Sequence, residues 1–430
     1  MILNLIFGAL ALLSFALTLW QWLVARRFPL HQRVAESPMP PDPRRSRREE
    51  ALTSSAQPST LNPHPPLTLL KPLKGRDAST EDCLRSWFSQ HYTGPTQILF
   101  GVAAADDPVC GLVRKLVQDF PGSDAQLVAG TPLPGANAKV AKLVELERLA
   151  KHDLLVISDA DVGVPPDFLA NIVAPLREAP LARPMGEGLG VRACGLVCCF
   201  YRLANPTTLA MQWEAIAINA DFWSQVLQSR SLKPLDFALG AVMATRRQQL
   251  TEIGGFAPLM DCLADDYQLG NRIAHRGHSI ALSPIVVECW SAPMGWAAVW
   301  KHQLRWARTI RVCQPAPYFF SLLSNGTLWP LLWFIVRPGP VALAGALLCC
   351  LVRILTALDL QQRLNQNPGP SVPQRSSQAP WHYAWLIPVK DLLQAALWLL
   401  AFLGNRIEWR GQRMRLRPDG TLEPLKQPAP

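Results

Sequence analysis

The chain opens on an apolar run that carries no charged residue from Met1 to Val24. A helix of that length can cross the hydrocarbon layer of a bilayer. A cleaved signal peptide is the alternative. However, the run lacks a basic start and a clear small-residue cleavage site, and Arg26 and Arg27 follow it at once. We therefore predict a membrane anchor over residues 1–25, so the rest of the chain must fold beside a membrane.

Two further apolar stretches, Leu328–Leu358 and Trp381–Leu403, lie near the other end. A polar, Pro-rich loop, Gln361–Pro380, separates them. We predict about two membrane spans within residues 326–405. A re-entrant first stretch is the alternative, because Arg337-Pro338-Gly339-Pro340 favours a break in the helix.

Basic residues gather beside the apolar segments, which sets the expected orientation. Arginines recur in residues 26–65, a Pro- and Ser-rich stretch that we predict to be a flexible linker, and again in the tail, residues 406–430. Both should be cytoplasmic, with Gln361–Pro380 on the opposite side. The net charge of +10 is thus better explained by anionic lipid headgroups than by nucleic acid, for which no binding motif is present.

Between these ends, strand-like and helix-like runs alternate. Strands are predicted at Leu67–Leu70, Gln97–Val102, Ala125–Ala129, Asp153–Ser158 and around Phe237–Ala241, and helices at Glu81–Gln90, Pro108–Phe120, Val140–Ala150 and Asp265–His275. The alternation predicts an α/β domain over residues 66–290, with a parallel sheet covered on both faces. The ten cysteines have no regular framework, and we expect them to be reduced.

Acidic residues follow two of these strands, where ligands bind in parallel sheets. Asp107 follows Gln97–Val102, and Asp159-Ala160-Asp161 follows Asp153–Ser158. Positions two apart on a strand share a face, so Asp159 and Asp161 can converge on one cation. Mg²⁺ or Mn²⁺ prefers such oxygen ligands and completes its shell with water and phosphate. An isolated Asp-x-Asp is more often a solvated turn, but the apolar strand before this one favours a site.

A second acidic pair, Asp265-Asp266, opens the predicted helix Asp265–His275. The simple explanation is favourable negative charge at a helix N-terminus. Beside a metal site, one of the two carboxylates can also act as a general base toward a hydroxyl within hydrogen-bond reach.

Basic residues supply the complementary charge. The stretch around His302–Trp306 reads as an amphipathic helix, with tryptophans on one face and cations on another, and we place it in an interfacial segment, residues 291–325. Arg305 also suits bidentate contact with a diphosphate. Lys139 stands at the start of the helix Val140–Ala150, where it either contacts phosphate or is simply an exposed basic residue, the reading we favour from the residues alone.

These motifs together resemble a known family. Leu69-Leu70-Lys71-Pro72-Leu73-Lys74-Gly75, with Asp77 after it, resembles the opening motif of ceramide glucosyltransferases. The order Asp107, Asp159, Asp266, Arg305-Trp306 is similar to the D, D, D, (Q/R)xxRW signature of that group within family 2 glycosyltransferases. The tail from Phe402 to Gly411 more closely resembles bacterial hopanoid-biosynthesis glycosyltransferases. The resemblance covers about Leu67 to Leu416.

The resemblance implies a GT-A, Rossmann-like domain that binds a nucleotide sugar, and an inverting, metal-dependent transfer from a UDP-sugar to a lipid hydroxyl. The implied roles are donor binding by Lys74, Asp107, Lys139, Asp159, Arg305 and Trp306, divalent-cation binding (Mg²⁺ or Mn²⁺) by Asp159 and Asp161, and catalysis by Asp266 with Asp265 beside it. The favoured acceptor is a hopanoid polyol (bacteriohopanetetrol) receiving N-acetylglucosamine or glucose. Ceramide with glucose, or diacylglycerol, is the alternative. The expected location is the bacterial inner membrane, as a multi-pass protein whose catalytic domain is cytoplasmic.

Two positions depart from the ceramide-type pattern. His302 stands where the signature has Gln or Arg, and Asp161 restores a full Asp-x-Asp where those enzymes tend to keep only the first aspartate. Two rival functions are a processive polysaccharide synthase and a membrane-anchored scaffold. The first usually needs more spans, and the second should have lost an acidic cluster.

Overall fold

The computed structural model describes residues 2–33, 64–130, 135–177, 192–366, 380–409 and 412–425. Most of the predicted linker, residues 26–65, and most of the loop Gln361–Pro380 lie outside these ranges.

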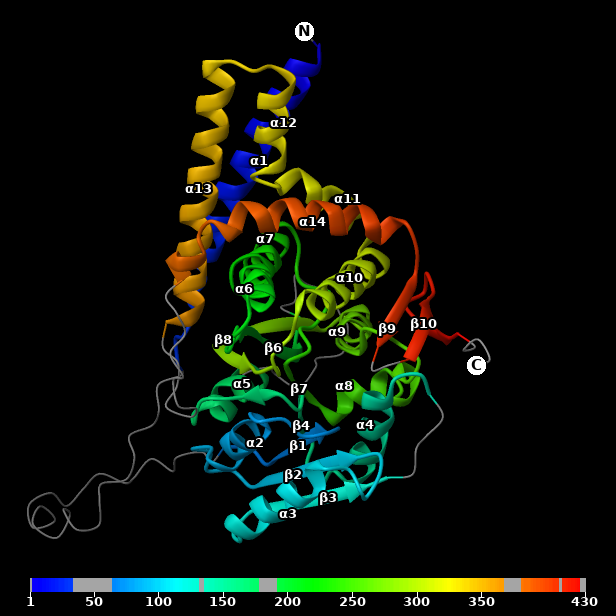
Figure 1. The fold of residues 1–430 in the computed structure, drawn as a ribbon. Helices are drawn as coiled ribbons and strands as arrows, with labels where there is room; N and C mark the ends of the chain where they lie inside the picture. The colour runs from blue at the N-terminus through cyan, green and yellow to red at the C-terminus, as the bar shows by residue number, and fades with distance from the viewer. Residues whose placement is uncertain are drawn as a thin grey trace, which may run out of the picture.

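Within the described residues, a mixed sheet of eight strands forms the centre of an α/β domain (Figure 1), in the order β3-β2-β1-β4-β7-β6-β8-β5. The strands are β1 (Leu67–Pro72), β2 (Thr96–Val102), β3 (Asp124–Ala129), β4 (Leu154–Ser158), β5 (Val162–Gly163), β6 (Cys194–Leu203), β7 (Val242–Arg246) and β8 (Ser279–Cys289). The strands β1 to β4 are parallel, as predicted. However, β7 is antiparallel to both β4 and β6. The sheet is therefore not parallel throughout, and the strand expected at Phe237–Ala241 begins only at Val242.

Helices pack around this sheet. The sequence predicted α2 (Thr80–Phe88), α3 (Val109–Asp119), α4 (Ala138–Leu149) and α9 (Asp265–His275). It did not predict α5 (Phe168–Arg177), α8 (Arg247–Glu252) or η3 (Ala257–Leu259). Apolar side chains from both faces of β1, β2 and β4 are buried beneath them. This burial explains the strongly apolar strands, since a sheet covered on both faces needs apolar residues on both.

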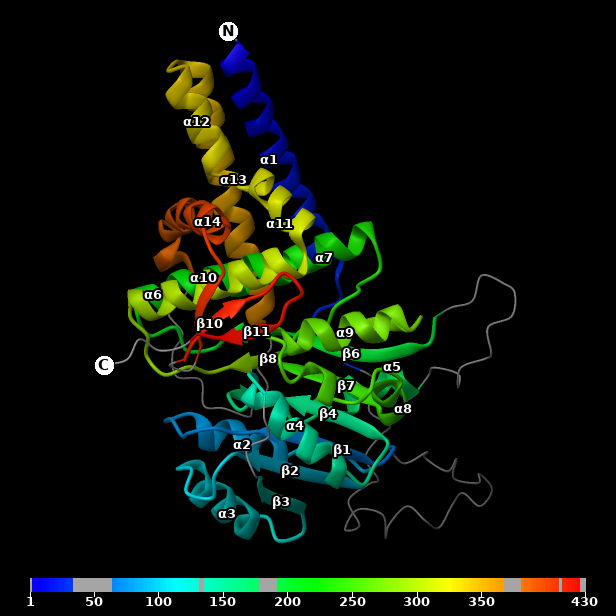
Figure 2. The same cartoon turned by 90° about the vertical axis from the view of Figure 1, so that its right-hand side faces the viewer.

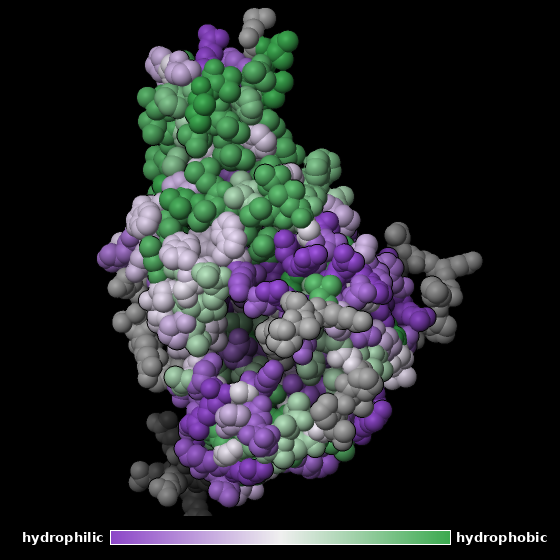
Figure 3. Space-filling model, turned by 45° about the vertical axis from the view of Figure 1, so that its right-hand side comes forward, coloured by the Kyte–Doolittle hydropathy of each residue, from purple (hydrophilic) through white to green (hydrophobic). Residues whose placement is uncertain are grey.

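Three helices stand away from the sheet as a column (Figures 1 and 2): α1 (Ile2–Arg27), α12 (Leu328–Val336) and α13 (Pro340–Asn365). Their outer surface is hydrophobic (Figure 3), and large apolar side chains such as Leu12 and Leu347 are exposed on it. In the described part of the chain, α1 and α13 are long and apolar enough to cross a membrane. A third span results if α12 is counted with α11 (Pro315–Phe320) and η4 (Ser321–Ser324), which meet it at a 55° bend.

The direction of α13 corrects the predicted topology. Trp333 Nε1 of α12 donates to Asn4 Oδ1 at one end of the column, over 3.0 Å. At the other end, Arg363 of α13 donates to the carbonyl of Arg26 over 3.1 Å. The chain therefore enters the loop Gln361–Pro380 at the same end of the column as Arg26, and not at the opposite end as predicted. The apolar stretch Leu328–Leu358 turns back on itself at its Pro-Gly-Pro sequence, so α12 and α13 form a hairpin. This confirms the break that the re-entrant alternative expected there.

The expected span Trp381–Leu403 also differs. Its helix, α14 (Leu386–Phe402), lies across the domain end of the column (Figure 1) and not alongside it. Trp398 Nε1 donates to the carbonyl of Tyr318 in α11 over 2.9 Å. The charged residues Lys390 and Asp391 are buried against protein partners, which explains why an apolar helix can carry them.

Helices α6 (Leu209–Ile216), η2 (Ala217–Phe222), α7 (Trp223–Leu232) and α10 (Trp296–Cys313) join the column to the sheet, and η5 (Pro380–Tyr383) precedes α14. After α14, the described part of the predicted basic tail forms an antiparallel sheet of β9 (Arg406–Trp409), β10 (Gln412–Leu416) and β11 (Leu422–Pro424). Leu422 N donates to the carbonyl of Asp261 over 2.7 Å, so this sheet lies against the loop that leads into α9.

Candidate active site

The acidic clusters lie at one edge of the sheet because β2 and β4 are both parallel to β1, which lies between them. Asp107 follows β2, and Asp159 and Asp161 follow β4. Beneath them, the buried ammonium of Lys71 in β1 donates to Ser158 Oγ over 3.1 Å and to the Asp159 carbonyl over 2.7 Å. Lys71 thereby holds the end of β4 in place.

Lys139 joins the two acidic clusters. Its Nζ lies 2.7 Å from Asp159 Oδ1 and 3.0 Å from Asp265 Oδ2. Burial alone would lower the pKa of Lys139, but Asp159 and Asp265 outweigh it and raise the pKa, so the side chain is a fixed cation. Lys139 is therefore not the exposed basic residue that the sequence alone favoured.

Asn137 sets the position of Lys139. Its side-chain oxygen caps α4 by accepting from Lys139 N over 3.0 Å and from Val140 N over 3.3 Å. Its Nδ2 donates to the Cys262 carbonyl over 2.8 Å and to Asp265 Oδ1 over 3.3 Å. An N-cap asparagine is an ordinary helix start, so nothing in the sequence indicates this second contact.

Two carboxylates at this edge are held in their ionised form with difficulty. Burial, and then repulsion by Asp159, raise the pKa of Asp161 to about 6. Burial, and then repulsion by Asp265, raise the pKa of Asp266 to about 6. Added positive charge would therefore stabilise the ionised form of both carboxylates.

Gly240 leaves room for Asp266. A Cβ at Gly240 would lie 2.6 Å from Asp266 Oδ2, a distance that real Cβ atoms essentially never show. The other carboxylate oxygen, Oδ1, accepts from Tyr267 N over 2.8 Å. The carboxylate is thus fixed from two sides at the N-terminus of α9.

Asp107 fixes the loop that follows β1. Its two carboxylate oxygens accept from Gly75 N over 3.0 and 3.1 Å, and Oδ1 also accepts from Val109 N over 3.0 Å. Gly75 has a φ of +70°, which favours glycine. Lys74 is exposed in the same loop. Asp107 and Lys74 thus belong to one edge of the site, and at least part of the role of Asp107 is to shape this loop.

The aromatic-basic motif lies on α10, as predicted, and contacts α6. His302 Nδ1 lies 2.6 Å from Glu214 Oε1, and Gln303 Nε2 donates to the same oxygen over 2.9 Å. The Glu214 side chain is only 1% exposed. The Trp306 ring lies 4.9 Å from the His302 ring and 6.1 Å from that of Phe222. Arg305 is partly buried on the same helix.

Tyr201 of β6 lies between the motif and the acidic clusters. Burial raises the pKa of its phenol, and Cys289, Asp266, Glu214 and Asp159 add to the effect. Its ring lies 5.5 Å from that of Phe222. Tyr201 and Glu214 were missed in the sequence; the only available signal was a single acidic residue within the apolar run of α6.

The site could hold a cation only if a bound ligand supplied some of the coordinating atoms. In the part of the chain that the structure describes, no three His, Cys, Asp or Glu side chains are grouped to hold a metal ion. The carboxylates available to a cation are the predicted pair, Asp159 and Asp161. Asp159 is at the same time paired with Lys139. Mg²⁺ is commonly held by one or two carboxylates together with substrate phosphates and water, and these two carboxylates meet that requirement.

Three kinds of similarity bear on identity. The family model "Glycosyl transferase family 21" matches residues 11–422. A ceramide glucosyltransferase of Candida albicans is 31% identical over 138 residues, which are 29% of this chain and 25% of that protein. Ceramide glucosyltransferase 3 of Caenorhabditis elegans is 22% identical over 221 residues, 51% of this chain and 45% of that protein. The chain thus aligns with less than half the length of these relatives.

Among solved structures, a mannosyltransferase from Pyrobaculum calidifontis in complex with GDP-Man and Mn²⁺ is 20% identical, with a TM-score of 0.49 over 93% of this chain and 98% of that one. At this level of similarity, the comparison says nothing about the ligands of the present chain. The family match covers nearly the whole sequence, including the acidic clusters and α10. The predicted resemblance to ceramide glucosyltransferases is confirmed at this level, and the chain belongs to glycosyl transferase family 21.

Proposed function

We propose that this glycosyltransferase moves a sugar from a UDP-sugar to the hydroxyl group of a membrane lipid. The observation that carries the proposal is the pairing of Lys139 with both Asp159 and Asp265. This pairing links Asp159, in the cluster expected to bind the donor, with Asp265, in the cluster expected to activate the acceptor. A hydrophobic column adjoins the same domain (Figure 3), which supports a membrane lipid as the acceptor.

On the donor side, Asp107 and Lys74 would contact the nucleoside, and Lys139, Asp159, Arg305 and Trp306 the diphosphate and its surroundings. Trp306 would also line the entrance for the acceptor. Asp159 and Asp161 would hold a divalent cation, Mg²⁺ or Mn²⁺. Such a cation, when bound, offsets negative charge on the leaving diphosphate. Lys139 and Arg305 supply fixed positive charge for the same purpose, and preorganised charge of this kind is often the largest contribution to catalysis.

On the acceptor side, Asp266 is the better candidate for the base. Asp265 already pairs with Lys139 and accepts from Asn137. The raised pKa of Asp266, about 6, brings this carboxylate nearer to the operating pH, where a general base is most effective. Asp265 would then act by orienting Lys139.

The acceptor lipid follows from resemblance alone. The tail motif favours a hopanoid polyol such as bacteriohopanetetrol, with N-acetylglucosamine or glucose as the sugar. The names of the two aligned relatives favour ceramide and glucose. In either case we place the protein in the bacterial inner membrane, with its α/β domain in the cytoplasm, where UDP-sugars are made.

The test is transfer by the full-length protein reconstituted in lipid nanodiscs. UDP-glucose and UDP-N-acetylglucosamine would each be offered with ceramide, diacylglycerol or bacteriohopanetetrol, and products identified by mass spectrometry. We expect one donor–acceptor pair to give a glycolipid, and Asp159→Asn to abolish it. Asp153→Asn is the matched control, because Asp153 is an exposed carboxylate at the opposite end of β4. If the folded protein neither transfers sugar to any of these lipids nor hydrolyses either donor, the proposal fails.

A further inference from the structure

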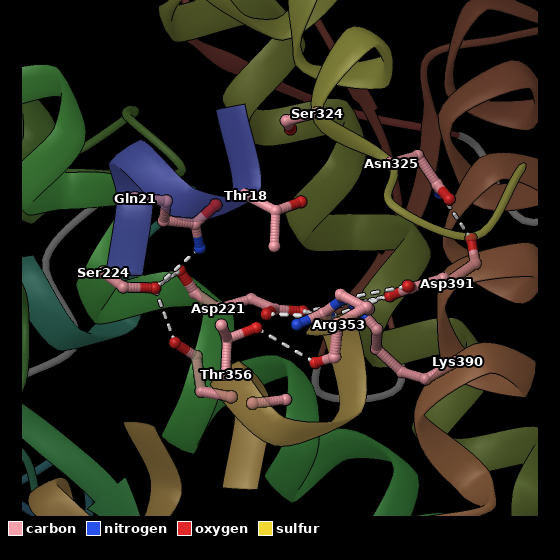
Figure 4. Close-up of polar contacts among 12 residues, drawn as sticks. Thr18, Gln21, Asp221, Ser224, Ser324, Asn325, Arg353, Thr356, Lys390 and Asp391 are labelled. Carbon is pink, nitrogen blue, oxygen red and sulfur yellow. Dashed lines mark hydrogen bonds and ion pairs between the residues drawn. The ribbon is translucent and has the colours of Figure 1, made fainter. Parts of the chain in front are cut away.

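Four charged side chains are buried where the column meets the α/β domain (Figure 4). They are Asp221 of η2, Arg353 of α13, and Lys390 and Asp391 of α14, and together are called the junction quartet below. Each side chain is less than 10% exposed. None of them belongs to the candidate active site or to any sequence motif.

The junction quartet is fully paired within itself. Both Asp221 oxygens accept from Arg353 Nη2 over 2.9 Å, while Asp391 accepts from Arg353 Nε over 2.9 Å and from Nη2 over 2.8 Å. Lys390 Nζ contacts Asp221 and lies 2.9 Å from Asp391 Oδ1. Two anions therefore face two cations, and the cluster is neutral overall.

Neutral side chains extend the connection to the other membrane helices. Thr327, which precedes α12, donates from Oγ1 to Asp391 over 2.7 Å. Gln21 of α1 donates from Nε2 to Ser224 Oγ of α7 over 2.7 Å, three residues beyond Asp221. All three helices of the column are thus tied to α14 or to the segment η2–α7.

The opposite face of η2 contacts the active-site side of the molecule. Asn219 exchanges two hydrogen bonds with the backbone of Leu203 at the end of β6, over 2.8 and 3.2 Å. Residues two apart on a helix face in roughly opposite directions, so Asn219 is turned to the sheet while Asp221 is turned to the membrane helices. The next residue, Phe222, packs against Tyr201 and Trp306.

Stability alone is a weak reason to keep such a cluster. Replacing a buried ion pair by well-packed apolar residues is often neutral or stabilising, and the best-attested use of buried charges is to fix one arrangement among several. Arg353 lies in α13, a candidate membrane-spanning helix, and ionisable residues within membrane helices are costly and mark function by default. In addition, η2 is a π-helix, a form that occurs frequently at functional sites.

We propose that the junction quartet positions the lipid-acceptor side of the active site. By holding Asp221, it fixes η2 between the column and β6, and so sets the place of Phe222 against Trp306. The four residues are positioning residues, not catalytic ones. The inference rests on the proposed function, because Trp306 is assigned there to the acceptor side and the leaving group.

The experiment compares three variants of the full-length protein in nanodiscs. Asp221→Asn removes the bond to η2 and leaves an unpaired positive charge. Asp221→Asn with Lys390→Met removes the same bond but keeps the cluster neutral and retains the Arg353–Asp391 pair. Asp359→Asn is the matched control: Asp359 also lies on α13, where it accepts from Trp22 Nε1 over 2.7 Å, but this bond joins α13 to α1 and not to η2.

Two readouts are needed. Hydrogen exchange of the backbone amides of residues 217–223 reports on η2 without any substrate. We expect both Asp221 variants to exchange there about 10-fold faster or more, with β4 unchanged. For transfer to the lipid that the wild type accepts, we expect KM for the lipid to rise about 10-fold while the affinity for UDP stays within about twofold. The Asp359→Asn control should match the wild type in both.

The neutral double variant decides between positioning and structural support. If it regains wild-type exchange in residues 217–223 and a wild-type KM for the lipid, the junction quartet is only a structural ion cluster and the inference is overturned. If the single variant Asp221→Asn fails to fold, the double variant still provides the test. If the wild type transfers sugar to no lipid, the proposed function fails separately, and unchanged exchange in the double variant would still overturn the inference.

Discussion

At the scale of single residues, Lys139 divides the roles of the two neighbouring carboxylates of α9. It pairs with Asp265 over 3.0 Å, whereas Asp266 contacts Tyr267 N and lies against Gly240. Adjacent acids of the same type thus receive different environments. These contacts support Asp266 as the candidate base, the role that the family resemblance already implied for it.

Replacing Asp266 should separate catalysis from donor binding. We expect Asp266→Asn to lower turnover by about 10²-fold or more, the usual scale for a positioned base, with the affinity for UDP unchanged. In the wild type, turnover should fall as the pH drops below about 6, because protonation of Asp266 removes the base. A pH profile of kcat for the wild type, and UDP titrations of the variant, measure both. A mild Asp266→Asn beside a crippling Asp265→Asn would reverse the assignment.

Replacing Asp161 should affect the cation. Its pKa is raised by burial and by Asp159, so a bound divalent ion would relieve the repulsion between the two carboxylates. We expect Asp161→Ala to abolish or greatly weaken Mn²⁺- or Mg²⁺-dependent binding of the UDP-sugar, as measured by calorimetry. Unchanged affinity in the presence of either ion would remove Asp161 from the metal site.

At the scale of elements, the site depends on the close approach of a loop to a helix. The segment between α7 and β7 comes so close to the N-terminus of α9 that Gly240 has no room for a side chain. Glycine there serves the catalytic geometry, because any Cβ would push against the Asp266 carboxylate.

Gly240→Ala should therefore lower activity without unfolding the protein. Displacement of a catalytic group by about 1 Å can cost about 10²-fold in rate, so we expect at least about a 10-fold loss of kcat with a melting temperature close to that of the wild type. Gly111→Ala on α3 is the matched control, since a Cβ there meets nothing within 4 Å. Equal activity of the two variants would contradict the proposed crowding.

At the scale of the whole molecule, the described helices place both ends of the α/β domain at one side of the column. The α1 and α13 helices end together beside Arg26, and the turn between α12 and α13 lies at the far end with Asn4. In this arrangement α14 lies across the end of the column and not along it (Figure 1). Arg26 and Arg27 lie at the domain end of the column, and the positive-inside tendency makes that end the expected cytoplasmic one.

Cysteine labelling tests this topology. With the ten native cysteines, all free, first replaced, Gly339→Cys should react with an impermeant reagent on intact spheroplasts. Gln366→Cys should react only after the membrane is opened, because it follows α13 at the domain end. Labelling of Gln366→Cys from outside would restore the arrangement first predicted from the sequence, with two spans and an external loop.

The sequence by itself determined the local structure of this protein. Period-two and period-3.6 patterns are set by the backbone, and they correctly predicted β1 to β4, α2 to α4, α9 and α10. Because carboxyl ends of parallel strands share an edge, the same reasoning brought Asp107 and Asp159 to one side of the sheet. The apolar run likewise predicted α1, a helix long and apolar enough to cross a membrane.

Only the tertiary structure decided what pairs with what. Lys139 reaches Asp265, His302 reaches Glu214, and Asp221 reaches Arg353 across 132 residues of sequence. The directions of α12, α13 and α14 were likewise decided by the tertiary structure. A hydrophobic stretch indicates that a helix contacts lipid or the protein core, but it does not indicate the direction of that helix. Ion pairs and helix directions depend on which distant segments of the chain come into contact, and local sequence patterns carry no information about those contacts.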